Sequence, residues 1–97
     1  MLTYSGDTDE CDGLVEAARD ADLFLCEAAF HEGRDDAIEG VHLTGLRAGR
    51  MAARARAGRL LLTHLPVWND PQRAVSEAAQ AYDGPLTVAV SGMSYRV

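Results

Sequence analysis

The chain has 97 residues, of which 47% are hydrophobic, and its formal net charge at pH 7 is -6. A chain of this length forms one domain with a modest core, and its hydrophobic content excludes a disordered chain. The net negative charge argues against nonspecific binding of nucleic acid, because phosphate binding needs a positive surface. It does not exclude an enzyme whose site becomes positive through a bound metal.

Cysteine content and hydropathy predict a cytoplasmic protein without a membrane partner. The two cysteines, Cys11 and Cys26, have neither CxxC nor histidine spacing, which argues against a zinc site and a disulfide framework. We interpret them as reduced thiols. No apolar run approaches the ~20 residues of a membrane helix, and no charged-then-apolar leader opens the chain.

The first third of the chain predicts two strands and one helix. Residues 1–5 are compatible with a short strand, and a Gly-Asp-Thr-Asp turn follows. Thr8 or Asp9 can cap a helix over 11–20. Apolar side chains recur there at helical spacing and predict one buried face: Leu14, Val15, Ala17 and Ala18. A second, mostly apolar strand covers 22–26.

The middle of the chain predicts an acidic loop and a second helix. Residues 31–40 are polar and contain two glycines. Thr44 is a good N-cap for a helix over 45–57, and Gly58 is a typical C-terminal stop. One face of this helix carries Leu46, Gly49 and Ala53, and another carries Arg47, Arg50 and Arg54. An arginine stripe can bind phosphate, but the spacing favours a solvated helix face.

An uninterrupted leucine run, 60–62, is typical of a strand buried on both faces, and this strand ends at His64. Asp70 followed by Pro71 is a strong helix start. The third helix has a predicted buried face: Ala74, Val75, Ala78, Ala79 and Tyr82. Residues 86–90 predict another buried strand, and 93–97 a final short one.

This order of elements predicts an α/β fold with about four to five strands in one mixed, largely parallel sheet and three helices. The carboxyl ends of parallel strands lie along one edge, where Asp7, Glu27, His42 and His64 can meet. A carboxylate with an imidazole can hold zinc or manganese, and a second histidine with a carboxylate behind it can act as an oriented acid or base.

Each of these four residues also has a purely structural interpretation. Asp7 can serve as a turn or cap residue, and Glu27 as a salt-bridge partner. His42 and His64 can satisfy local hydrogen bonds. We expect His31, in the acidic loop, to be a surface residue.

Four motifs point beyond these alternatives: Gly6-Asp7-Thr8, Glu27-Ala28-Ala29-Phe30, His42-Leu43-Thr44 and Leu62-Thr63-His64. In order and rough spacing they resemble the C-terminal half of a metallo-β-lactamase-fold hydrolase, in the branch of ribonuclease Z and the cyclic-nucleotide phosphodiesterases. The resemblance covers essentially the whole chain. It implies a single partial domain over 1–97, half of an αββα sandwich in which two mixed sheets pack face to face between helices.

The resemblance also implies a role for each site residue. Asp7 would bridge two metal ions, and His64 would be a terminal ligand of one of them. His42 would protonate the leaving oxygen, and Glu27 would orient His42. The zinc or manganese ions would generate hydroxide. The family's His-x-His-x-Asp-His motif lies in an N-terminal half and does not occur among the three histidines here, so we expect metal to be absent or weakly bound in this chain.

Three functional hypotheses follow. The first is the C-terminal portion of a metal-dependent phosphodiester hydrolase, inactive or weak alone, whose substrate is a nucleotide or RNA. The second is a non-catalytic dimerisation or interaction module that retains the half-fold. The third is a small α/β domain that binds an anion at a helix N-terminus such as that after Thr44. The expected partner is the missing N-terminal half, or a second copy that associates through an exposed apolar sheet face.

Overall fold

The computed structural model describes residues 1–6, 10–28, 43–63, 70–90, 92 and 94. Strands and helices alternate along them: β1 (Leu2–Tyr4), α1 (Asp12–Ala18), β2 (Leu23–Glu27), α2 (Gly45–Ala55), β3 (Leu60–Thr63), α3 (Pro71–Ala79) and β4 (Leu86–Val88). The predicted α/β class with three helices is confirmed. The predicted acidic loop over 31–40 and the strand over 93–97 fall outside the part of the chain that the structure describes.

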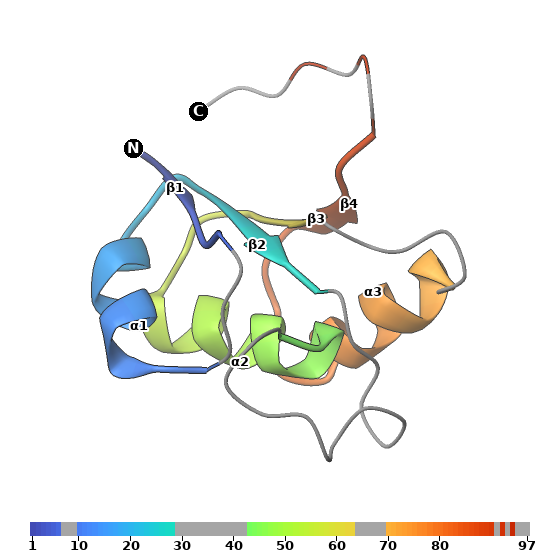
Figure 1. The fold of residues 1–97 in the computed structure, drawn as a ribbon, viewed down its shortest axis with the longest axis horizontal. Coiled ribbons are helices and arrows are strands. Elements are labelled where there is room, and N and C mark those ends of the chain that lie inside the picture. The colour runs from blue at the N-terminus through green and yellow to red at the C-terminus, as the bar shows by residue number, and fades with distance from the viewer. Residues whose placement is uncertain (7–9, 29–42, 64–69, 91, 93, 95–97) are drawn as a thin grey trace.

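The four strands form one sheet in the order β1-β2-β3-β4, and every pair is parallel. All three helices lie on the same face of this sheet (Figure 1). Parallel strands joined in sequence by crossovers of one hand place the connecting helices on one side. The result is a two-layer section, with helices covering one face of the sheet. Among the described helices, none is long and apolar enough to cross a membrane.

The core lies between the sheet and the helices. Phe24 and Cys26 on β2 and Leu60 and Leu62 on β3 are fully buried there. Side chains alternate along a strand, so the residues between these point to the opposite face. That far face is apolar and, from the strand register, carries Leu2, Tyr4, Leu23, Leu25 and Leu61. Leu2 and Tyr4 are 52% and 58% exposed, so part of this apolar face meets solvent.

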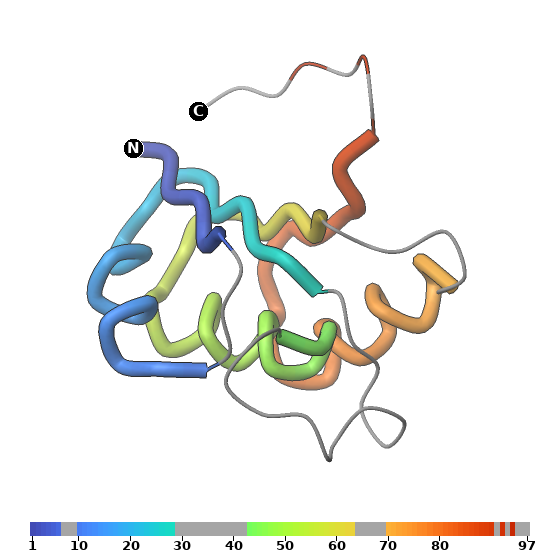
Figure 2. Tube along the Cα trace, in the orientation of Figure 1, coloured from blue at the N-terminus to red at the C-terminus, as the bar shows by residue number. Residues whose placement is uncertain are grey.

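Helices α2 and α3 lie side by side beneath the strands (Figure 2) and approach each other closely. A Cβ atom added to Gly45 would lie 2.3 Å from the Ala74 carbonyl oxygen, and one added to Gly49 would lie 2.4 Å from that of Ala78. Glycine on α2 opposite alanine on α3 therefore sets the separation of the two helices. Any larger residue at 45 or 49 would force the helix backbones apart.

Two of the predicted helix caps are confirmed. The Thr44 hydroxyl accepts a hydrogen bond from the Arg47 N–H at 3.1 Å, and the Asp70 carboxylate accepts one from the Gln72 N–H at 3.0 Å, with Pro71 in the first turn. Each cap satisfies an N–H that has no partner within its helix. Both helices therefore begin where the sequence predicts.

Two other helix ends differ from the prediction. The N-cap of α1 is Cys11, which makes no side-chain cap, rather than Thr8 or Asp9. At the end of α2 the left-handed residue is Arg56, with φ 56°, rather than Gly58. Gly58 instead lies close to the chain before β2: a Cβ added there would lie 3.1 Å from the Asp22 carbonyl oxygen, and its N–H donates to the Ala21 carbonyl at 2.8 Å.

The predicted buried faces are right in outline but wrong at two alanines. Ala17 and Ala79 are exposed, whereas Glu77 on α3 is buried. The buried face of α2 runs through small residues: Gly45, Ala48, Gly49, Met51, Ala52 and Ala55. The burial of Glu77 is partly compensated within its own helix, where the Arg73 guanidinium donates to its carboxylate at 3.0 Å.

Substituting Gly49 tests the helix contact. Gly49→Ala should lower the free energy of unfolding by about 1–3 kcal/mol, because the new methyl group overlaps the Ala78 carbonyl. Gly13→Ala is the matched control, since nothing lies within 4 Å of a Cβ at that exposed position of α1. It should raise stability by about 0.5–1 kcal/mol through helix propensity. Urea unfolding measures both; equal gains would show that the helices do not meet at Gly49.

Candidate active site

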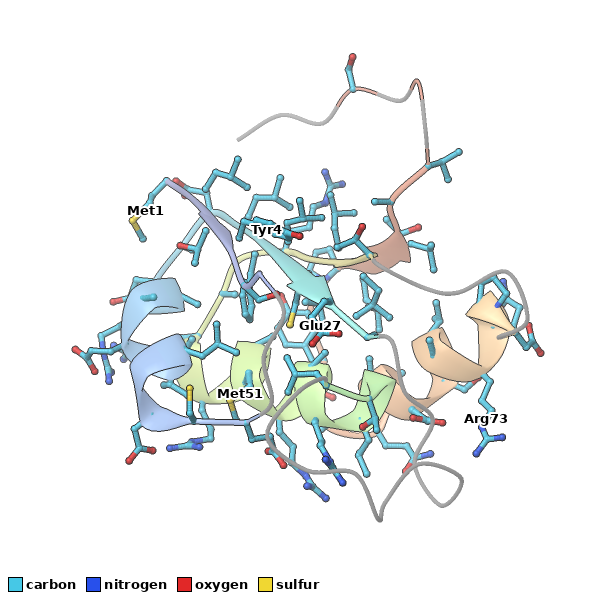
Figure 3. All side chains as sticks on the ribbon, viewed as in Figure 1. Met1, Tyr4, Glu27, Met51 and Arg73 are labelled. Carbon is cyan, nitrogen blue, oxygen red and sulfur yellow. The ribbon has the colours of Figure 1, made fainter. Side chains whose placement is uncertain are left out.

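Glu27, the last residue of β2, is a buried carboxylate at the carboxyl edge of the sheet. Its side chain is 0% exposed, and its Oε1 accepts a hydrogen bond from the Leu43 backbone N–H at 2.9 Å. Figure 3 shows Glu27 between the end of β2 and the start of α2. A buried carboxylate is costly without hydrogen-bond donors, so the backbone N–H of Leu43 is part of what keeps it there.

The backbone around Glu27 joins the neighbouring strands. The Glu27 N–H donates to the Ser5 hydroxyl at 2.9 Å. Glu27 is paired in register with Thr63 of β3, and the next N–H, that of Ala28, donates to the Thr63 carbonyl at 3.0 Å. Residues from the ends of β1 and β3 are thus tied to the end of β2.

Asp7, His42 and His64 lie outside the described residues, so Glu27 is the one predicted site residue that the structure places. The described residues nearest to the other three in sequence nevertheless converge on it. Leu43 follows His42, Thr63 precedes His64, and Ser5 is two residues before Asp7. Three chain segments that carry the remaining candidates therefore start from backbone held at Glu27 or its neighbour.

Within the described ranges, no group of three or more His, Cys, Asp or Glu side chains is arranged to hold a metal ion. The proposed ligands Asp7 and His64 are not among those residues. What the described part of the site supplies is a buried carboxylate acceptor and a rigid backbone frame. Such a carboxylate can orient a neighbouring imidazole and fix its tautomer.

Sequence reasoning did not identify Ser5 and Leu43 as parts of this edge. Leu43 acts through its backbone N–H, which any residue except proline provides, so its residue type carries no signal. Ser5 offers a weak signal, because a hydroxyl residue directly before a Gly-Asp turn is suited to local hydrogen bonding.

The cysteines carry no disulfide, as the sequence predicts. Cys26 lies on the helix-facing side of β2, and burial raises the pKa of its thiol. Cys11 is exposed at the start of α1. Burial and a raised pKa both oppose formation of the thiolate, so Cys26 is a packing residue at this site rather than a nucleophile.

The arginine stripe on α2 is ion-paired with residues at the start of α1. Arg50 lies 3.3 Å from the Glu10 carboxylate, with Arg47 at 4.0 Å from the same group, and Arg54 lies 2.9 Å from the Asp12 carboxylate. The Arg50 and Arg54 side chains are about half exposed, so their ion pairs contribute little to stability. The solvated-face interpretation is confirmed for these two arginines, whereas the Arg47 side chain is only 13% exposed.

Several known proteins match the chain across nearly all of its length. An uncharacterised protein of Mycobacterium leprae is 48% identical over 96 residues, which cover 99% of this chain and 34% of the relative. Ribonuclease Z of Myxococcus xanthus is 42% identical, over 96% of this chain and 31% of the relative. No protein-family model matches the chain.

A solved structure is similar in fold as well as in sequence. The metallo-β-lactamase fold protein YhfI from Bacillus subtilis superposes with a TM-score of 0.86 at 35% identity, covering 95% of this chain and 38% of that protein. The chain thus spans about a third of the length of the relatives it matches.

Two substitutions test the Glu27 contact. Glu27→Leu removes the acceptor for the Leu43 N–H and should lower the free energy of unfolding by about 1–3 kcal/mol. Glu27→Gln keeps an acceptor oxygen and should cost less. Amide hydrogen exchange at Leu43 separates this contact from general packing. Exchange should accelerate in Glu27→Leu and stay slow in Glu27→Gln; equal exchange in both variants would contradict the contact.

Thiol labelling tests the placement of the two cysteines. In the native protein a thiol reagent such as DTNB should modify Cys11 rapidly and leave Cys26 unmodified, because Cys26 is buried and its pKa is raised. In denaturant both thiols should react. The Cys11→Ser variant, which isolates Cys26, provides the control; rapid labelling of native Cys11→Ser would contradict the buried position.

Proposed function

We propose that this chain, which has the fold of part of a metallo-β-lactamase-fold protein and is related in sequence to ribonuclease Z, forms the C-terminal portion of a metal-dependent phosphodiester hydrolase. The observation that supports this proposal best is the buried Glu27 carboxylate at the carboxyl edge of a parallel sheet. In open α/β sheets this edge is where sites are built. The backbone next to the other three candidates is held to the same point.

In this proposal Glu27 and His42 act together. The bond from the Leu43 N–H to Glu27 restrains the backbone directly after His42. With its imidazole oriented by the Glu27 carboxylate, His42 donates a proton to the oxygen that leaves phosphorus. Glu27 is a positioning residue, since it acts through the histidine.

Asp7 and His64 would hold metal in the complete protein. When bound there, zinc or manganese would activate water as the nucleophile and would stabilise negative charge on the phosphoryl group. Two protein ligands do not hold a catalytic ion tightly, so the 97-residue chain alone should be inactive or very weak. The remaining ligands would come from the other two-thirds of the protein length seen in the relatives.

The apolar far face of the sheet supports association with that remaining section. Leu2 and Tyr4 are more than half exposed on a face that no described helix covers. Apolar surface of this kind marks an association site. We propose the remaining section of the fold as its occupant. Alternatively, a second copy of this chain covers the face, and light scattering would then detect a dimer.

The proposed substrate is a phosphodiester, either a tRNA 3′ end or a smaller nucleotide such as a cyclic nucleotide. The net charge of -6 favours the smaller substrate in this section of the protein. An RNA substrate would need basic surface from the remaining section.

The competing function is a non-catalytic interaction module, which the same apolar face favours. The two functions differ in whether addition of the remaining section of the fold produces hydrolysis. A module would bind its partner without hydrolysing a phosphodiester under any conditions.

Complementation tests the proposed function. The chain is assayed for hydrolysis of bis-p-nitrophenyl phosphate with Mn²⁺ or Zn²⁺, alone and with the section of the Mycobacterium leprae relative that lies outside the aligned region. Activity should appear only in the mixture. In it, His64→Ala should reduce the rate by about 100-fold or more, and Glu27→Gln by about 10–100-fold.

His31→Ala is the control, because His31 is expected at the surface. The mixture that contains His31→Ala should hydrolyse the substrate at the same rate as the mixture that contains the unmodified chain. A mixture that forms a complex yet hydrolyses nothing would support the interaction module instead. Activity that survives His64→Ala would contradict the metal role of His64.

A further inference from the structure

Residues 70–90, the α3–β4 unit, bury few large side chains. Helix α3 packs against the glycines of α2 through Ala74 and Ala78. Strand β4 has three residues, and its apolar side chains, Leu86 and Val88, are only partly buried. Contacts between small residues and a short edge strand remove little apolar surface from water. The unit therefore depends on whatever larger side chain it inserts into the core.

Tyr82 is the largest buried side chain of the α3–β4 unit. It lies one helical turn beyond Ala78 and is 6% exposed, and the other buried residues of the unit are two alanines and Glu77. The Tyr82 hydroxyl donates to the Ala57 carbonyl, in the connection between α2 and β3, at 2.8 Å. Burial raises the pKa of the phenol, so the hydroxyl keeps the proton that it donates. The unit is thus bonded to the neighbouring connection through one buried side chain.

Gly84 leaves the space that the Tyr82 ring occupies. A Cβ atom added to Gly84 would lie 2.3 Å from the Tyr82 Oη and 2.5 Å from Cζ. One residue later, the Pro85 carbonyl accepts a hydrogen bond from the Leu60 N–H at 2.9 Å. The end of the ring therefore lies between the α2–β3 connection and the turn that follows α3, and both segments are held close to it.

We propose that Tyr82 is a latch that holds the α3–β4 unit on α2 and β3, and that this unit opens before the rest of the sheet when the hydroxyl bond breaks. The latch joins the segments that precede β3 and β4, at the amino edge of the sheet. Glu27 ends β2 at the opposite, carboxyl edge. The unit therefore opens without breaking the bond between Glu27 and Leu43, and the latch does not depend on the proposed function.

Three backbone N–H groups report on this opening by native-state hydrogen exchange of the full 97-residue chain. The Leu60 N–H donates to a carbonyl of the α3–β4 unit, and the Ala89 N–H donates to a carbonyl of β3, each at 2.9 Å. The Phe24 N–H joins β2 to the Arg59 carbonyl at 2.8 Å and does not involve the unit. In the unmodified chain Leu60 and Ala89 should have lower protection factors than Phe24. Equal protection at all three would overturn the proposal.

Tyr82→Phe tests the hydroxyl, because it removes one oxygen and keeps the buried ring. Exchange at Leu60 and Ala89 should accelerate by about 5–10-fold, and exchange at Phe24 should stay unchanged. Tyr4→Phe is the matched control, since Tyr4 is 58% exposed on β1, and it should alter none of the three rates. Unchanged rates at Leu60 and Ala89 in Tyr82→Phe, or an equal acceleration at Phe24, would overturn the latch.

Gly84→Ala tests the same contact from the other side. The new methyl group overlaps the Tyr82 hydroxyl, whereas the backbone at Gly84 has no positive φ that would strain alanine. The variant should accelerate exchange at Leu60 and Ala89 by about 5–10-fold. In the Tyr82→Leu background, which lacks the ring, the further change should be less than about 2-fold. The same acceleration in both backgrounds would overturn the latch, and Tyr82→Phe decides the question if Tyr82→Leu does not fold.

Discussion

The hydrogen bond between the Glu27 carboxylate and the Leu43 N–H joins the end of β2 to the backbone just before α2 at the carboxyl edge of this sheet. A carboxylate with no exposed surface must be met by donors, and this one is met by the backbone that begins α2. Its own backbone is bonded to Ser5, and the next residue to Thr63. Glu27 and its neighbour Ala28 thus join three segments that are far apart in the sequence.

Much of the fold could be predicted because its signals are local. The leucine run of β3 leaves no polar face and is buried as predicted, and Asp70-Pro71 and Thr44 begin helices through their own side chains. Errors fall where local chemistry is ambiguous. Alanine is compatible with either face of a helix, so Ala17 and Ala79 fall on predicted buried faces although they are exposed.

The remaining differences have tertiary causes. The buried Glu77 is paired with Arg73, one turn away, and Gly58 lies close to the Asp22 backbone instead of ending the helix. At the candidate site, the position of Glu27 at a strand end was predictable from the apolar pattern of β2. Its contact with the Leu43 N–H was not, because a backbone donor leaves no trace in residue type. The register of the parallel strands determines which chain segments lie next to one another at this edge, and the register is known only from the folded sheet.

The order of the strands has a consequence for how the chain is made. Each strand pairs with the strand before it in the sequence, so none has to wait for a later strand to be inserted between two earlier ones. A chain emerging from the ribosome can bury every new strand as it appears, which keeps loop closures short and limits the exposure of unfinished sheet. Among the described strands, the two at the edges of the sheet, β1 and β4, have three residues each and offer little template for further strands.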